Sequence, residues 1–223
     1  MKKSIFLIWL VLVSAPLLFA QKVGRITLAM DNNADIITYE ADKTLLINFS
    51  KDGKILNWGT EDNWGRLLNY MGRVDNYTAA EDSAFRGKVK YIGAVQITYY
   101  ASYDDKELSG KIKSIGSANF DYYRSFEDEA IRGKIKSIGA TSFSYYPSVD
   151  NESYKGKIRT VGNTNITYYA SFDDKAYKGK VKSIGNINFS YYSSFDRREY
   201  QGGMKPGTTY APYVGGIKYF VRN

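Results

Sequence analysis

The stretch GKIKSIGATSFSYYPSVDNESYK, residues 133–155, is one copy of a unit that the chain repeats without insertion or deletion. Five copies of this 23-residue unit fill residues 87–201, and a degenerate sixth copy begins at Gly202. A fixed short period indicates one supersecondary unit that is stacked on copies of itself. The repeats therefore decide the architecture of the protein, although they do not identify a ligand.

Two short strands are predicted within each unit. In the copy at residues 110–132, β-branched and polar residues alternate over 111–115, Gly116 marks a turn, and an aromatic-rich stretch covers 120–126. The acidic residues 127–129 predict a second turn. The glycine content and the many Tyr, Val and Ile residues disfavour a helix. Each unit is therefore predicted to be a β-hairpin.

Side chains alternate between the two faces of a strand, so the sequence also predicts faces. On the first strand, Lys134, Lys136 and Ile138 are predicted to point away from the face that carries Ile131, Gly133 and Ile135. On the second strand, the predicted apolar set is Phe120, Tyr122 and Phe126. One face of the sheet is then apolar, and the other is a surface of Lys, Tyr, Ser and Thr.

The fold predicted from these hairpins is all-β, an elongated antiparallel meander of stacked β-hairpin repeats. Polar turns occur at both ends of each strand pair, and lysines alternate along the strands, where a coiled interior would require apolar residues. The alternative is a β-solenoid with one coil per unit. The two folds differ in pairing, because a solenoid places each strand parallel to its own copy in the next unit.

Residues 1–20 are predicted to be a secretory signal peptide. Lys2 and Lys3 precede an apolar run from Ile5 to Ala20, which is short for a membrane span of about 20 residues. An uncleaved anchor is the alternative. Cleavage lowers the formal net charge from +8 to +6 and leaves no predicted transmembrane segment. The protein is thus expected to be exported, to the periplasm, the cell surface or the medium.

The remaining segments flank the repeats. Residues 21–86 are predicted to be an N-terminal β cap with degenerate repeats, because residues 53–59 echo the start of the unit and because Trp58 and Trp64 lie here. Residues 202–223 are predicted to supply a C-terminal capping strand over 215–221. Divergent terminal repeats of this kind close the open apolar ends of a repeat stack.

Composition excludes several chemistries. The chain contains no His and no Cys, so triads with histidine, cysteine nucleophiles and His- or Cys-ligated zinc are impossible. Acidic pairs recur in the repeat turns, as Asp104-Asp105, Asp128-Glu129 and Asp173-Asp174, which is typical of solvated turn residues rather than of one cleft. The segment Asp31–Asp35 resembles the start of a calcium loop but has Ile36 where glycine is required, so a turn is favoured. No enzyme activity, cofactor or metal is predicted.

Columns of Lys and Tyr in register are the candidate binding residues. They are Lys113, Tyr123, Lys136, Tyr146, Arg159, Tyr169, Lys182 and Tyr192. The prediction is a non-enzymatic protein with a structural or interaction role at the cell envelope or outside the cell. The alternative is a binding module for an anionic glycan or envelope polymer. The expected partner is an envelope polysaccharide or another envelope protein, and nucleic acid is not expected.

The repeats also resemble known families. One motif is similar to the Y-x-G-x-aromatic…G pattern of MORN repeats, without their later G-x-G: Tyr177-Lys178-Gly179-Lys180-Val181 followed by Gly185. The Tyr-Tyr pair before an acidic turn resembles the hairpin repeats of cell-wall-binding and clostridial-toxin proteins, without their G-W. The whole chain resembles uncharacterised secreted bacterial proteins with G-K-I-K-S-I-G repeats. The first resemblance implies membrane or protein association, and the second implies sugar binding.

Overall fold

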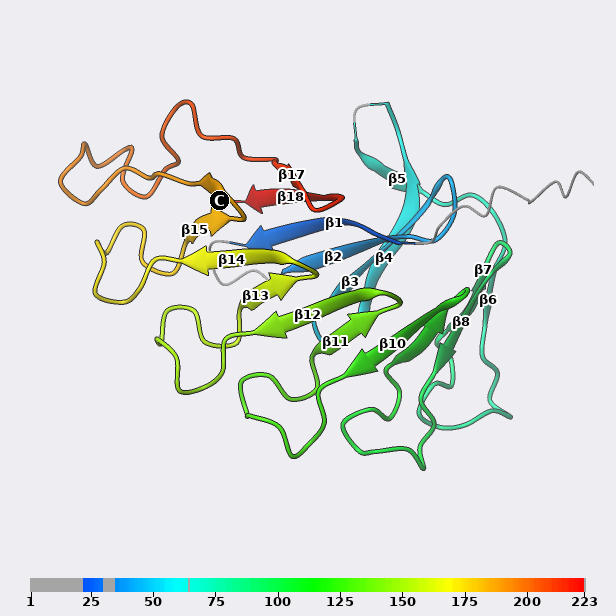
Figure 1. Cartoon of the computed structure of the whole chain (residues 1–223). Helices are drawn as coiled ribbons and strands as arrows, with labels where there is room; N and C mark the ends of the chain where they lie inside the picture. The colour runs from blue at the N-terminus through cyan, green and yellow to red at the C-terminus, as the bar shows by residue number, and fades with distance from the viewer. Residues whose placement is uncertain (1–21, 30–34, 64, 223) are drawn as a thin grey trace, which may run out of the picture.

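The computed structural model describes residues 22–29, 35–63 and 65–222 of the chain. Over these residues the protein is all-β, and its strands form two sheets of mostly antiparallel, hairpin-connected strands (Figure 1). The predicted signal peptide lies outside the described residues, as does most of the Asp31–Asp35 segment. The described part of the chain contains no helix with the length and apolar character needed to cross a membrane.

The larger sheet is the meander that the repeats predict. Its eleven strands follow one another in chain order from β6 to β16, and each is antiparallel to its neighbours. Every strand pairs with its chain neighbour rather than with its copy in the next unit, so the antiparallel meander is confirmed against the solenoid. The strands are β6 (Val74–Asn76), β7 (Val89–Ile92), β8 (Val95–Tyr99), β9 (Ile112–Ile115), β10 (Ala118–Tyr122), β11 (Ile135–Ile138), β12 (Thr141–Tyr145), β13 (Ile158–Val161), β14 (Thr164–Tyr168), β15 (Val181–Ile184) and β16 (Ile187–Asn188).

The smaller sheet joins the two ends of the described chain. Its order is β17-β18-β1-β2-β3-β4-β5, and β1 and β18 are parallel, with Arg25 opposite Lys218 and Ala29 opposite Arg222. The strand predicted near the C-terminus therefore exists, but it pairs with β1 and not with the last repeat. The strands are β1 (Lys22–Ala29), β2 (Ile36–Glu40), β3 (Leu45–Ser50), β4 (Ile55–Glu61), β5 (Leu67–Asn69), β17 (Tyr213–Val214) and β18 (Ile217–Arg222).

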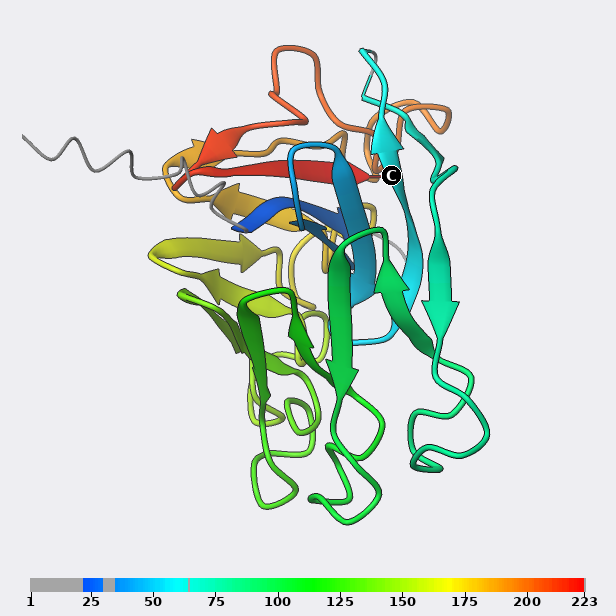
Figure 2. The ribbon, with the colours of Figure 1, turned by 90° about the vertical axis from the view of Figure 1, so that its right-hand side faces the viewer.

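The two sheets pack face to face and share one hydrophobic core (Figure 2). Phe120 of the repeat sheet meets Tyr39 and Phe49 of the smaller sheet edge-on, with ring centroids 6.2 and 5.4 Å apart. The Ile135 amide donates a hydrogen bond of 2.8 Å to the carbonyl of Lys51 in the β3–β4 turn. The N-terminal strands thus cover the apolar face of the repeats, where the sequence suggested a cap at one end.

Glycine fixes the tight turn inside each hairpin. Gly116, Gly139 and Gly162 begin two-residue turns and have φ of 55°, 53° and 52°. No other residue type has a positive φ anywhere in the described ranges, so only the first central residue of each turn is left-handed. This geometry is that of a type II′ turn, whose twist matches antiparallel strands. The unit therefore requires its second glycine for backbone reasons.

A β-bulge in every repeat corrects the predicted faces. Asp121 pairs with Ser137 but Tyr122 pairs with Ile135, which leaves Lys136 as the extra residue. The inserted residue places Ile135 and Ile138 both in the core, at 0% and 2% exposure. The prediction that Ile138 shares a face with Lys134 and Lys136 was therefore wrong. Phe126, predicted to be buried, is 82% exposed because β10 ends at Tyr122 and Phe126 lies in the following loop.

Candidate functional site

The predicted Lys and Tyr residues form a ladder of cation–aromatic pairs, here called the outer ladder. The second basic residue of each unit lies over the second tyrosine of the preceding unit. In the centre, Lys136 Nζ is 5.6 Å from the ring centroid of Tyr123, and the Arg159 guanidinium carbon is 5.6 Å from that of Tyr146. The other pairs are Lys90–Tyr77, Lys113–Tyr100, Lys182–Tyr169 and Lys205–Tyr192. All eight predicted residues lie in this ladder.

The bulge aims these cations. The extra residue of the bulge is the second basic residue of the unit in each case. Lys113, Lys136, Arg159 and Lys182 all occupy this position. Bulges commonly re-aim a side chain, and here they turn it out of the strand alternation and over the neighbouring tyrosine ring. Sequence reasoning missed the bulge because Lys-Ile-Lys reads as simple alternation.

The tyrosine rings of the outer ladder are held from the protein side. The Tyr123 hydroxyl donates a 3.0 Å hydrogen bond to the carbonyl of Phe143, and Tyr146 donates in the same way to Ile166. Tyr77, Tyr100 and Tyr169 repeat this bond. Burial also raises the pKa of the Tyr123 and Tyr146 hydroxyls. These five hydroxyls thus bind backbone carbonyls, and what each of these pairs can offer a partner is its cation and part of its ring.

The cations of the outer ladder face solvent. Lys113, Lys136, Arg159 and Lys182 are exposed, and no carboxylate of the described residues lies within ion-pairing distance of them. Lys90, at the first edge, differs because it pairs with Glu81 at 2.8 Å. Successive units are separated by two strands, so the exposed cations recur about every 10 Å along the sheet. Such a row can pair with the charges of an extended anionic chain.

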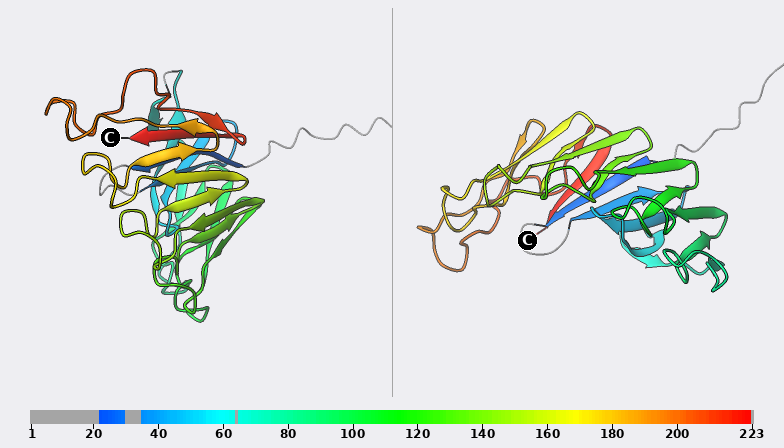
Figure 3. Two further views of the ribbon diagram at one scale, coloured as in Figure 1. Left: turned by 60° about the vertical axis from the view of Figure 1, so that its left-hand side comes forward. Right: turned by 90° about the horizontal axis from the view of Figure 1, so that it is seen from below.

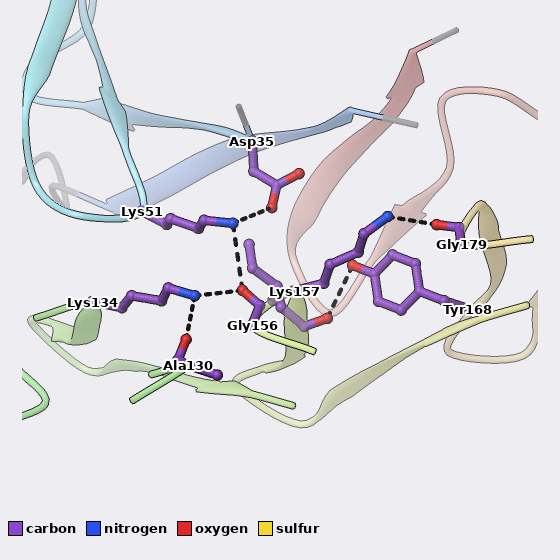
Figure 4. A network of polar contacts seen from close by, with 9 residues as sticks. Asp35, Lys51, Ala130, Lys134, Gly156, Lys157, Tyr168 and Gly179 are labelled. Atoms are coloured by element: carbon purple, nitrogen blue, oxygen red, sulfur yellow. Dashed lines mark hydrogen bonds and ion pairs between the residues drawn. The ribbon is translucent and has the colours of Figure 1, made fainter. Parts of the chain in front are cut away.

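A second ladder, here called the inner ladder, lies nearer to the smaller sheet. The first lysine of each unit lies over the first tyrosine of the same unit, as Lys134 does over Tyr145 at 5.3 Å. The Lys134 ammonium donates to the carbonyls of Gly156 and Ala130, at 2.7 and 2.5 Å (Figure 4). The other pairs are Lys88–Tyr99, Lys111–Tyr122, Lys157–Tyr168 and Lys180–Tyr191. These lysines bind one unit to the next.

The lysines at the centre of the inner ladder are half-buried, which disfavours their charged form. Burial lowers the pKa of Lys134 to about 8, and the nearby Lys51 adds to the effect. Lys51 itself lies 3.8 Å from Asp35 and donates to the Gly156 carbonyl that Lys134 also uses (Figure 4). Burial also lowers the pKa of Lys157 and Lys111. The predicted common face of the first and second lysines is therefore wrong, and only the second lysines are available to a partner.

The carboxylates of the repeat turns have structural partners. Asp128 accepts hydrogen bonds from the amide and hydroxyl of Ser148 in the next loop, and Asp174 does the same for Ser194. The pKa of Asp128 is lowered most by its bond with the Ser148 hydroxyl, and that of Asp174 is lowered most by the amide of Ala176 and then by Ser194. In the described ranges no cluster of three or more acidic side chains could hold a metal ion. Asp128 and Asp174 thus link each loop to the next.

A cavity of about 350 Å³ lies where the β3–β4 turn meets the first repeats. It is lined by Trp58 and Tyr99, with Lys88 and Lys111 of the inner ladder beside them. The cluster of tryptophans in the N-terminal segment was the sequence signal for this region, although Trp64 lies outside the described residues. Searches of protein-family models, curated proteins and solved structures find no match to this chain. The resemblances of the repeats therefore stay predictions.

Proposed function

We propose that this protein is an exported, non-enzymatic interaction protein that holds an extended partner along its repeats. The observation that carries the proposal is the outer ladder, in which four successive units present an exposed lysine or arginine over a tyrosine with no carboxylate within ion-pairing distance. A row of equal, weak contacts becomes useful through multiplicity, because binding at one unit raises the effective concentration at the next. The absence of His and Cys from the sequence and the structural use of the turn carboxylates support a role without catalysis.

The partner that best fits the outer ladder is an anionic polymer, such as a polyuronic acid of an envelope or extracellular matrix. Lysine and arginine form charge-assisted hydrogen bonds with carboxylates and sulfates. A purely structural role for the ladder is the competing function, because cation–aromatic pairs at exposed sites contribute about 0.5–1 kcal/mol each to stability. The two functions differ in whether loss of the cations affects binding.

The test is binding of polygalacturonate to the mature protein and to the double variant Lys136→Gln, Arg159→Gln. The proposal expects affinity to fall about tenfold or more in the variant, and to weaken with salt as the charges are screened. The double variant Lys175→Gln, Lys178→Gln removes the same charge from an exposed loop and serves as the control. Equal affinity of the folded ladder variant and the wild type for polygalacturonate, or no binding of polygalacturonate to either, would contradict an anionic partner.

A further inference from the structure

A row of exposed apolar side chains, here called the tip row, lies in the loops at one end of the strands of the repeat sheet. The five loops that follow β8, β10, β12, β14 and β16 each carry one large apolar residue at the same position of the unit. Its members and their exposed fractions are Tyr103 (87%), Phe126 (82%), Val149 (89%), Phe172 (87%) and Phe195 (95%). They are 23 residues apart, and four of the five are aromatic. The row is separate from both ladders.

The loop backbone holds these residues outward. In each loop a backbone hydrogen bond closes a four-residue turn, and the tip residue is the third of the four. Asp104 donates its amide to the carbonyl of Ala101 around Tyr103, and Asp173 does so to Ala170 around Phe172. The Asp104 and Asp173 carboxylates accept the amides of Ala101 and Ala170 in return. Exposure of the ring is thus a property of an ordered loop.

The exposed tips have no evident structural use. Burying a Phe side chain stabilises a protein by about 1.5–3 kcal/mol relative to leaving it exposed, and the tips forgo this gain in every repeat. Single exposed apolar residues are normal on protein surfaces, but an aligned set is typical of an interaction site. The same position, five times over, is therefore a stronger sign of a partner than the exposed lysines, which also serve solubility.

The charge around the tips constrains the partner. An acidic residue follows each tip directly: Asp104, Glu127, Asp150, Asp173 and Asp196. The loops at 78–87, 101–110, 124–132 and 147–156 each carry net negative charge, and the last two loops are neutral. The chain as a whole is basic, so these four loops form an acidic stretch at one end of the strands. An anionic polymer or an anionic lipid surface would be repelled at Tyr103, Phe126 and Val149 and would gain no net attraction at Phe172 and Phe195.

The shape of the row also constrains the partner. The loops follow one another along an arc at one end of the strands (Figures 1 and 3). The row is one side chain wide, and its members recur about every two strand spacings, roughly 10 Å. A flat bilayer would meet only part of an arc, whereas a single chain can follow it. Successive tips are about one disaccharide of an extended polysaccharide apart.

We infer that the tip row binds a single chain of an uncharged polysaccharide. The aromatic rings offer flat apolar faces to the C–H faces of successive sugars. The neighbouring carboxylates keep free acceptor sites for sugar hydroxyls, because an ionised carboxylate offers about four such sites. This site does not depend on the outer ladder, and each of the two can fail without the other.

The experiment measures binding of the mature protein to hydroxyethylcellulose, dextran and mannan, with carboxymethylcellulose as the anionic counterpart of the first. At least one neutral polymer should bind. If that polymer is hydroxyethylcellulose, carboxymethylcellulose should bind more weakly. The double variant Phe126→Ser, Phe172→Ser should lose about tenfold or more in affinity. The double variant Met71→Ser, Tyr210→Ser removes exposed apolar side chains elsewhere and should bind as the wild type does.

Three results would overturn the inference. The first is no binding to any of the three neutral polymers. The second is full affinity of the folded Phe126→Ser, Phe172→Ser variant for a polymer that binds the wild type. The third is loss in that variant of self-association or of phosphatidylcholine vesicle binding, with polysaccharide binding unchanged. The Lys136→Gln, Arg159→Gln variant should keep its affinity for the neutral polymer, which separates this site from the outer ladder.

Discussion

At the scale of single residues, the two tyrosines of each Tyr-Tyr pair lie in different environments. Tyr145 is buried at 3% exposure in the shared core, whereas Tyr146 is half-buried and donates its hydroxyl to the next unit. The sequence predicted opposite faces for the two residues from alternation alone, and the structure agrees. It could not predict that the Tyr146 hydroxyl would bind the Ile166 carbonyl, because that bond depends on the spacing between units.

Phe143 is expected to contribute more to stability than Tyr146. Phe143 is 2% exposed in the core, so Phe143→Ala should lower the free energy of unfolding by about 3–5 kcal/mol. Tyr146→Phe removes only the hydrogen bond to Ile166 and should cost about 0.5–1.5 kcal/mol. Urea unfolding followed by circular dichroism gives both values. Equal losses in the two variants would show that the core is not where the structure places it.

Stability should depend on pH through the inner ladder. The folded pKa of Lys134 is about 8, below its usual 10.5, so between these values the unfolded chain binds more protons and stability rises with pH. Burial raises the pKa of Tyr122 and Tyr168 well above 10, so above about pH 10 only the unfolded chain loses those protons and stability falls. Denaturant midpoints measured from pH 7 to 11 should therefore pass through a maximum.

Lys134→Met supplies the control for this profile. The variant keeps most of the side-chain volume and removes the titrating group, so the rise above pH 8 should become shallower. The fall above pH 10 should remain, because the buried tyrosines are unchanged. A rise that is identical in the wild type and the variant would assign it to other groups.

At the scale of elements, the unit is a hairpin with three fixed points: a type II′ turn, a bulge and a capped loop. The sequence showed the turn through its glycine and the loop through its acidic residues. It did not show the bulge, because a strand with one inserted residue still looks like a simple alternation of apolar and polar residues. The inserted residue is Lys136 itself, and its departure from the alternation leaves Lys136 exposed while Lys134 is half-buried.

The turn glycine is expected to be needed for its backbone conformation alone. Gly162 has a φ of 52° and has nothing within 4 Å of where a Cβ would lie. Gly162→Ala should therefore cost about 1–2 kcal/mol in unfolding free energy through left-handed strain. Asn163→Ala, at the next position of the same turn, should change the value little. Thermal melts of the two variants test this, and a harmless Gly162→Ala would mean that the turn is not type II′.

At the scale of the whole molecule, the repeats do not stand alone. Their apolar face is closed by strands from the two ends of the chain, and this part of the fold could not be predicted from the sequence. Strand patterns in residues 21–86 were visible, but the pairing of β1 with β18 joins segments on opposite sides of all the repeats. Local patterns carry no information about such a contact.

A single cooperative unfolding transition is expected, because one core contains residues of both sheets. Tryptophan fluorescence reports on residues near the smaller sheet, since Trp58 lies in β4, and tyrosine circular dichroism reports mainly on the repeats. The two signals should give the same midpoint in denaturant. Residues 87–201 produced alone should aggregate, since Phe120 and its neighbours would lose their cover. Separate midpoints would instead indicate two independent units.

The parallel pairing of β1 with β18 also determines how the protein responds to tension. Five residue pairs, from Arg25 opposite Lys218 to Ala29 opposite Arg222, lie side by side in the same direction. Pulling Lys22 and Arg222 apart loads all of these backbone hydrogen bonds together, in shear, whereas an antiparallel hairpin opened at its ends breaks its bonds one after another. A molecule pulled at these two strands would thus resist stretching first at the β1–β18 pairing. The repeats would unfold and lengthen only after that pairing had broken.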